Sequence, residues 1–226
     1  MDEPRVLARA QSPRGEVVLR RNRRDGRPVI ELRVNGVFVM DDLETTSERA
    51  LASQSLARCG SPRRVLIGGL GLGFTLEELL TDERVERVTV VEIEPAVAGW
   101  MADGTVPHGP PLLADPRVEV LVDDVAAVIS SSGPAAYDLI LLDVDNGPAY
   151  LVHESNAGLY RAEFLARCGD LLAPGGLLVI WSMTREDALL RDLASFASDA
   201  QAVPCAVRLG GDAGREETYW LHLAQA

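Results

Sequence analysis

The chain has 226 residues, a hydrophobic fraction of 47% and a formal net charge of −12. This length and apolar content are enough for one large globular domain with a substantial core. The acidic balance excludes unguided binding to nucleic acid, and no apolar run approaches the ~18 residues of a membrane helix. We therefore expect a small-molecule acceptor as the partner, with no nucleic acid and no membrane.

The cysteines and basic residues narrow the chemistry further. The three cysteines are scattered without the paired spacing of a disulfide framework or a zinc site, so we expect no metal. Every basic side chain apart from histidine is Arg, which excludes a Schiff-base lysine. The first ten residues, MDEPRVLARA, lack the apolar core of a signal peptide, and we expect a cytoplasmic protein.

The N-terminal region predicts a small β-strand module. Apolar and polar residues alternate over 15–21 and 28–40, with turn-like residues 22–26 between them, which indicates a β-hairpin. A second turn at Asn35-Gly36 allows a third short strand, whereas residues 1–12 show little pattern. Thr45-Thr-Ser-Glu48 is typical of a helix start, and the helix should run to about Arg58. We divide the chain into a module of residues 1–45 and a second domain of residues 46–226.

From Pro62 onward, strands alternate with helices, which predicts a mostly parallel sheet covered by helices on both faces. Residues 202–209 and 218–224 then form two strands around the glycine-rich segment 210–214, an antiparallel hairpin at the sheet edge. The result is a seven-stranded, Rossmann-like α/β fold typical of class I S-adenosylmethionine-dependent transferases. The expected strands are 64–68, 88–92, 118–122, 137–143 and 175–182, and the expected helices are 74–81, 95–102, 124–130, 156–173 and 185–199.

Three of the expected strands end in residues that suit an adenosine ligand. The first runs into a glycine loop that opens a helix, the arrangement in which backbone amides face a nucleotide, although such loops also occur without a ligand. The second ends in an acidic residue, the position that binds ribose hydroxyls, and two acidic residues follow the third. Together these ends predict an adenosine site formed by Gly68, Gly69, Gly71, Gly73, Glu92, Asp123 and Asp124.

Several motifs give the chain a family resemblance. It resembles the spermidine synthase family, aminopropyltransferases that have the class I methyltransferase fold. The residues that carry the likeness are NGV at 35–37, Glu48-Arg49, IGG at 67–69, VVEIE at 90–94, DPRVEV at 115–120, Asp124, YDLILLD at 137–143, GPA at 147–149, Leu159-Tyr160 and LAPGGLLV at 172–179.

The resemblance implies roles for three acidic residues. Glu92 would hold the ribose hydroxyls and Asp124 the adenine, with the glycine loop beneath the sugar and the sulfonium. Asp143 would be the catalytic carboxylate and would also contact the cofactor. A carboxylate there suits an amine acceptor, because the ammonium must lose a proton before it attacks, and partial burial raises a carboxyl pKa. The alternative is that Asp143 only caps its loop.

The departures from the family bear on which group is transferred. Gly71 stands where the family has an Asp that binds the amine of decarboxylated S-adenosylmethionine, and the Tyr-His/Gln-Glu cluster falls on residues 54–56, Gln-Ser-Leu. Loss of that Asp leaves the tail ammonium unpaired, whereas the carboxylate of intact S-adenosylmethionine can bind loop amides. We therefore expect transfer of a methyl or other alkyl group to a small amine or hydroxyl acceptor. Aminopropyl transfer, with Asp145 as the amine ligand, is the alternative.

Further expectations concern the acceptor and assembly. Asp145, Asn146 and His153 follow the fourth strand and are candidate substrate ligands, since this loop lies over the ligand end of such a sheet. Ser155 or Asn156 would alternatively serve only as a helix cap. A non-catalytic adenosyl-binding scaffold is a third function. The segment VIELRVNGVFVM has more apolar surface than a lone hairpin buries, so we expect a homodimer formed through the N-terminal strands.

Overall fold

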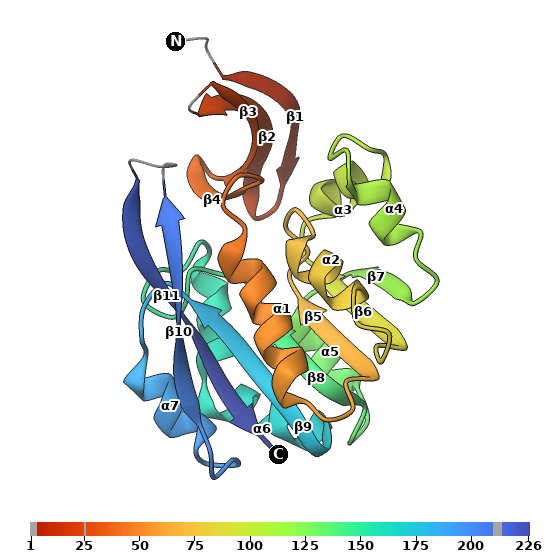
Figure 1. Cartoon of the computed structure of the whole chain (residues 1–226), viewed down its shortest axis with the longest axis vertical. Helices are drawn as coiled ribbons and strands as arrows, with labels where there is room; N and C mark the ends of the chain where they lie inside the picture. The colour runs from red at the N-terminus through yellow and green to blue at the C-terminus, as the bar shows by residue number, and fades with distance from the viewer. Residues whose placement is uncertain (1–3, 25, 210–213) are drawn as a thin grey trace.

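The computed structural model describes residues 4–24, 26–209 and 214–226. It contains two β-sheets, and the smaller one lies above one end of the larger (Figure 1). The smaller sheet consists of β1 (Arg5–Ser12), β2 (Gly15–Arg24), β3 (Arg27–Val34) and β4 (Val37–Asp41). The larger contains β5 (Arg64–Gly68), β6 (Arg87–Glu92), β7 (Val118–Val122), β8 (Tyr137–Leu142), β9 (Leu172–Ser182), β10 (Gln201–Leu209) and β11 (Arg215–Gln225).

The larger sheet confirms the predicted fold. Its strand order is β10-β11-β9-β8-β5-β6-β7, with β5 to β9 parallel and the last two strands antiparallel. The central strands β5 and β8 are buried along most of their length, which is why they read as continuous apolar runs. The helices are α1 (Thr46–Arg58), α2 (Phe74–Leu80), α3 (Pro95–Ala102), α4 (Gly109–Leu113), α5 (Val125–Ser131), α6 (Ala162–Leu171) and α7 (Asp187–Leu193).

The N-terminal sheet is larger than the sequence predicted. Its antiparallel order is β1-β2-β3-β4, so the hairpin and the third strand are confirmed and β1 is additional. The turn at Asn35 and Gly36 has φ values of 52° and 78°, the positive values that a tight hairpin turn requires. β1 was missed because it is a partly exposed edge strand whose register shifts between Val6 and Ala8, which breaks the alternation.

Two helical predictions differ from the structure, and one helix was not predicted. The single helix expected over 156–173 is a 3-10 helix, η1 (Glu154–Tyr160), followed by α6, because Arg161 has an extended backbone between them. The last helix ends at Leu193 instead of continuing to 199. The short α4 was not expected in a Pro-Gly-rich segment, but proline fits the first turn of a helix. Within the two predicted turns, Asp25 and residues 210–213 lie outside the described residues.

The N-terminal sheet contacts the glycine loop directly. The amide of Leu72 donates a hydrogen bond to Met40 Sδ at 3.2 Å, which joins β4 to the loop after β5. β4 ends at Asp41 and α1 begins at Thr46, while a division into two separate domains near residue 45 stays a prediction. No helix among the described residues is long and apolar enough to cross a membrane.

The predicted homodimer also stays a prediction. The N-terminal sheet exposes Val6, Val37 and Phe38, whose relative accessibilities are 46%, 49% and 42%. Light scattering at micromolar concentration tests the prediction, because a monomeric full-length protein would contradict it.

Candidate functional site

A cavity of about 410 Å³ lies between the N-terminal sheet and the carboxyl ends of the parallel strands. β4, the first turn of α1, the glycine loop and residues on β9 and β11 contribute to its wall. Of the residues predicted from the sequence, Gly68 and Gly73 do not line the cavity. The predicted residues that do line it are Gly69, Gly71, Glu92, Asp123, Asp124, Asp143, Asp145, Asn146 and His153.

The glycine loop is shaped by two close approaches. Gly69 has φ +95°, and a Cβ there would lie 2.1 Å from the carbonyl oxygen of Asp143, so only glycine lets the loop pass beside the end of β8. Gly71 has φ +51°, and a Cβ there would lie 2.6 Å from Met40 Sδ. A side chain at position 71 would therefore require Met40 to move. Both glycines leave the loop backbone next to the cavity.

Glu92 is buried at the end of β6, and both of its carboxylate oxygens bind backbone amides. Oε2 accepts from the amide of Leu70 at 2.9 Å, and Oε1 accepts from the amide of Glu94 at 2.8 Å. Burial raises the pKa of Glu92, while the hydrogen bonds from the amides of Glu94, Leu70 and Gly71 act in the opposite direction. Glu92 therefore holds the glycine loop in place, and its contact with a ribose stays a prediction.

Asp123 and Asp124 are exposed at the start of α5. Asp124 Oδ1 accepts from the amide of Ala126 at 2.8 Å and caps the helix, and Asp123 Oδ1 accepts from the amide of Asp124 at 2.7 Å. Each carboxylate thus has a local structural role and also faces the cavity. Their binding of adenine stays a prediction.

Asp143 follows β8 and lies half-buried at the cavity wall. Its Oδ2 is 3.5 Å from Thr75 Oγ1, at the outer limit for a hydrogen bond, and that hydroxyl also lies 3.2 Å from the carbonyl oxygen of Glu48. Burial raises the pKa of Asp143 to about 6. A carboxylate with this pKa holds and releases a proton close to neutral pH, as a general base must.

Glu48 is a site residue that the sequence did not assign. It lies in the first turn of α1, lines the cavity and accepts a hydrogen bond from Ser47 Oγ at 2.8 Å. Burial raises the pKa of Glu48 to about 7, and the neighbouring charge of Asp143 contributes to the rise. The sequence did contain one signal for this role. Thr45, three residues before Glu48, and Ala52, four residues after it, are uncharged, so neither can form a helical ion pair with Glu48.

Two aromatic residues complete this side of the cavity. Trp181 on β9 and Tyr219 on β11 meet edge to face, with ring centroids 5.0 Å apart, and both line the cavity. Aromatic residues on strands are more often core or interface residues than ligand contacts. Trp181 is indeed almost buried, yet the pair also forms a wall of the cavity next to the carboxylates.

The loop after β8 is organised by Asp145. Its Oδ1 accepts from the amide of Asn146 at 2.9 Å and also from the amide of Val152, and its Oδ2 accepts from Asn156 Nδ2 at 2.8 Å. His153 precedes η1 and caps it through Nδ1, which accepts from the amide of Ser155. The expected cap was Ser155 or Asn156, so the cap lies earlier in the chain. Substrate contacts by Asp145, Asn146 and His153 stay predictions.

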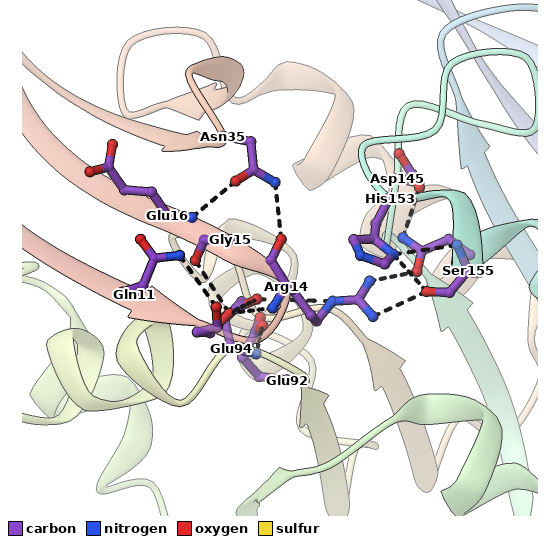
Figure 2. A network of polar contacts seen from close by, with 12 residues as sticks. Gln11, Arg14, Gly15, Glu16, Asn35, Glu92, Glu94, Asp145, His153 and Ser155 are labelled. Carbon is purple, nitrogen blue, oxygen red and sulfur yellow. Dashed lines mark hydrogen bonds and ion pairs between the residues drawn. The ribbon is translucent and has the colours of Figure 1, made fainter.

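Arg14 joins this loop to the N-terminal sheet. It lies in the turn between β1 and β2 and donates to Ser155 Oγ at 3.2 Å and to Asn156 Oδ1 at 2.8 Å (Figure 2). Its Nε also lies 3.9 Å from Glu94 Oε1. No pattern in the sequence indicates these contacts, and Arg14 lies 141 and 142 positions from Ser155 and Asn156. We call this group, Arg14 with Glu94, Ser155 and Asn156, the Arg14 bridge.

Comparison with known proteins agrees with this arrangement. Residues 44–200, more than half of the chain, match the Spermine/spermidine synthase domain. The chain belongs to the spermine/spermidine synthase family. This result confirms the resemblance found in the sequence.

Two curated relatives show how close the similarity is. A polyamine aminopropyltransferase from Aeropyrum pernix is 30% identical over 180 residues, which cover 71% of this chain and 55% of that protein. Putrescine N-methyltransferase 3 from Nicotiana tabacum is 32% identical over 120 residues, 52% of this chain and 29% of the relative. The matched regions therefore span about half or less of these relatives.

The spermidine synthase of Thermotoga maritima has the same fold as this chain. The two superpose with a TM-score of 0.80 and 19% sequence identity, covering 98% of this chain and 72% of the other. The superposition includes the N-terminal sheet, which precedes the residues matched to the spermine/spermidine synthase domain. The sheet that covers the cavity is therefore part of the fold shared with that structure.

Proposed function

We propose that this protein transfers the aminopropyl group of decarboxylated S-adenosylmethionine to a primary amine of a small acceptor. The observation that carries the proposal is a cavity in which Asp143 and Glu48 lie together beside the glycine loop. Neither has a basic partner among the described residues. Membership in the family and the names of the aminopropyltransferase relatives support the same reaction.

The residues present fit an adenosyl sulfonium substrate. The cavity passes over Gly69 and Gly71, where a Cβ would meet the Asp143 carbonyl or Met40, and Glu92 lies at the next strand end. Glu92 and Asp124 would hold the adenosyl group. When bound, the sulfonium supplies an activated carbon and a neutral thioether as the leaving group. No metal takes part in this proposal.

In the proposed reaction, Asp143 acts on the acceptor amine. Its carboxylate takes one proton from the substrate ammonium, which frees the nitrogen lone pair for attack. The nitrogen then bonds to the carbon next to sulfur, the carbon–sulfur bond breaks, and its electron pair stays on sulfur. The alkylated amine leaves as an ammonium, and Asp143 returns its proton to solvent. Holding the two reactants in line supplies much of the acceleration.

Methyl transfer from intact S-adenosylmethionine is the second candidate. Gly71 favours it, because the glycine loop lacks a carboxylate for the tail ammonium and Met40 Sδ lies where a side chain would begin. The similarity to putrescine N-methyltransferases supports it as well. The third candidate function is a scaffold that binds the adenosyl group without turnover.

The coproduct distinguishes these candidates. Purified protein is incubated with putrescine and other small amines, together with either decarboxylated or intact S-adenosylmethionine, and the products are read by mass spectrometry. Methylthioadenosine and an aminopropylated amine support the proposal. S-adenosylhomocysteine and a methylated amine would establish methyl transfer instead. Binding of methylthioadenosine without formation of either product would support the non-catalytic adenosyl-binding scaffold.

A further inference from the structure

Among the described residues, Glu48 is a carboxylate without a counterion. Its neighbour Arg49 pairs with Glu77 and Glu78 on α2. The two arginines that line the cavity within the described ranges are engaged elsewhere, Arg24 with Asp41 at 2.6 Å and Arg14 in the Arg14 bridge. Glu48 itself is hydrogen-bonded only to Ser47 Oγ among the side chains that the structure describes.

Glu48 and Asp143 come from different elements but meet at one place. Thr75, in the first turn of α2, contacts the backbone of Glu48 and the carboxylate of Asp143 through the same hydroxyl. The charge of Asp143 acts on Glu48, as does the charge of Glu44, which lies just before α1. Burial raises the pKa of Cys205 on β10 and of Tyr219 on β11, and the charges of Glu48 and Glu44 contribute to both rises. The groups that face Glu48 are thus acidic or neutral.

The neighbouring carboxylates of Glu48 and Asp143 destabilise the ligand-free protein, and a bound cation stabilises them. Two carboxylates in a partly buried cavity repel one another and lose hydration, so one of them tends to keep a proton. A primary ammonium offers three N–H donors and a positive charge, which suits two carboxylates and a hydroxyl. Trp181 and Tyr219 in the same wall add aromatic surface, which favours a cationic ligand.

The glycine loop indicates why Glu48 is needed. Position 71 has no side chain, and Met40 from β4 occupies the adjacent space. Any carboxylate for an ammonium at this end of the cavity must therefore come from another element. α1 supplies one, since its first turn places Glu48 beside Asp143. Asp145 is less suited, because its Oδ1 accepts hydrogen bonds from its own loop and its Oδ2 accepts one from Asn156 in η1.

We propose that Glu48 and Asp143 together bind a primary ammonium group, with Glu48 supplying the carboxylate that the glycine loop lacks at Gly71. The inference rests on the proposed function. The ammonium belongs either to the tail of decarboxylated S-adenosylmethionine or to the acceptor amine. In both cases Glu48 selects a cationic ligand and is a specificity-determining residue.

The test compares Glu48→Gln with Glu163→Gln. Glu163 is a matched control, because it also lies in the first turn of a helix but is exposed and outside the cavity. Calorimetry measures binding of decarboxylated S-adenosylmethionine and of methylthioadenosine, which has no ammonium, and initial rates give the KM for putrescine. Methylthioadenosine binding also shows whether each variant retains the adenosyl pocket.

Two results support the proposal and identify the ammonium. If Glu48→Gln binds decarboxylated S-adenosylmethionine at least tenfold more weakly, with methylthioadenosine affinity unchanged, the ammonium is that of the cofactor tail. If the KM for putrescine rises at least tenfold with cofactor affinities unchanged, it is that of the acceptor. Changes within twofold of the Glu163→Gln control in both measurements would overturn the inference. A wild-type protein without turnover would instead contradict the proposed function.

A second variant covers the case in which Glu48→Gln does not fold. Glu48→Asp keeps the charge on a shorter side chain and should retain ammonium binding that is weaker than in the wild type. Wild-type affinity for the ammonium ligand, relative to methylthioadenosine, should also rise at least threefold from pH 5.5 to pH 8 as the carboxyls ionise. A flat relative affinity, with Glu48→Asp indistinguishable from wild type, would overturn the inference.

Discussion

Two regions of the cavity wall use carboxylates in opposite ways. At the end of β6, Glu92 is surrounded by backbone amides, and each of its oxygens has a donor supplied by the protein. In the first turn of α1 and after β8, Glu48 and Asp143 face the cavity with hydroxyl donors but no basic partner among the described residues. The protein itself supplies the hydrogen-bond donors of Glu92, whereas Glu48 and Asp143 can still bind a cationic ligand.

This difference shows that burial of a carboxylate does not by itself indicate a role in ligand binding. A raised pKa occurs at all three residues, so the pKa alone does not distinguish a structural acid from a binding acid. The hydrogen-bond partners do distinguish them. We expect substitutions at Glu92 to affect both adenosyl binding and the loop that it holds, and substitutions at Glu48 and Asp143 to act on the amine.

The largest expected effect is that of Asp143→Asn. The asparagine cannot accept the ammonium proton, so turnover should fall by roughly 10²–10⁴, the usual contribution of general acid–base catalysis. Affinity for methylthioadenosine should stay within a few fold, because Asp143 acts on the acceptor. Raising the pH should restore part of the rate with an amine acceptor. Loss of all cofactor binding would place Asp143 in the adenosyl pocket.

Glu92→Gln should have the next largest effect. The amide keeps one oxygen acceptor but directs an NH₂ group at a backbone donor, so one of the two bonds is lost. Methylthioadenosine affinity should weaken by about 1.5–3 kcal/mol, roughly 10–150-fold. Because Glu92 also holds the loop, thermal stability should fall as well.

The control for Glu92→Gln is Glu119→Gln, at an exposed position on β7. Calorimetry and thermal unfolding of both variants separate the two contributions. Normal affinity in a Glu92→Gln protein of lowered stability would show that Glu92 is structural only.

Glu48→Gln should stabilise the ligand-free protein at alkaline pH. The pKa of about 7 in the folded protein exceeds the ordinary glutamate pKa of 4.5, so ionisation opposes folding as the pH rises between these two values. The side chain is only half-buried, and we expect a gain of about 1 kcal/mol at pH 8, or ~2–4 °C in Tm. Thermal unfolding at pH 4.5 should show almost no gain. A loss of stability at pH 8 would mean that Glu48 is already satisfied.

Arg14→Ala should have the smallest effect. Half-exposed polar contacts such as those of the Arg14 bridge contribute about 0.5–1 kcal/mol, so the Tm should fall slightly. Protease cleavage within 146–156 should become faster, because the loop loses its contact with the N-terminal sheet. Arg9→Ala, which removes an exposed ion pair with Glu16 on the same sheet, is the control. Equal cleavage rates in the two variants would show that the Arg14 bridge does not restrain the loop.

The larger sheet was predictable because its signals are local. Apolar runs identify β5 and β8, and the glycines after β5 predict a loop that Gly69 indeed brings against the Asp143 carbonyl. Residues at the ends of parallel strands lie at one edge of the sheet, so the fold alone brings Glu92 and Asp143 to a common cavity.

The other half of the site depends on packing between distant segments. Glu48 faces Asp143 because of the way α1 lies between the N-terminal sheet and α2, and no periodicity in the sequence specifies that rotation. The aromatic wall requires β9 and β11 to be neighbours, although Trp181 and Tyr219 are far apart in the chain. The break at Arg161 was hidden because residues on both sides of it suit a helix.

The Arg14 bridge has a consequence for the order of folding. Arg14 is made early in synthesis, but its partner Asn156 follows 142 residues later. At a synthesis rate of ~5–20 residues per second, Asn156 is added to the chain about 7–28 s after Arg14. Contacts of such high sequence separation form slowly. The cavity is therefore completed late, and an adenosyl ligand added during refolding should increase the final yield of native protein without accelerating the earliest phase.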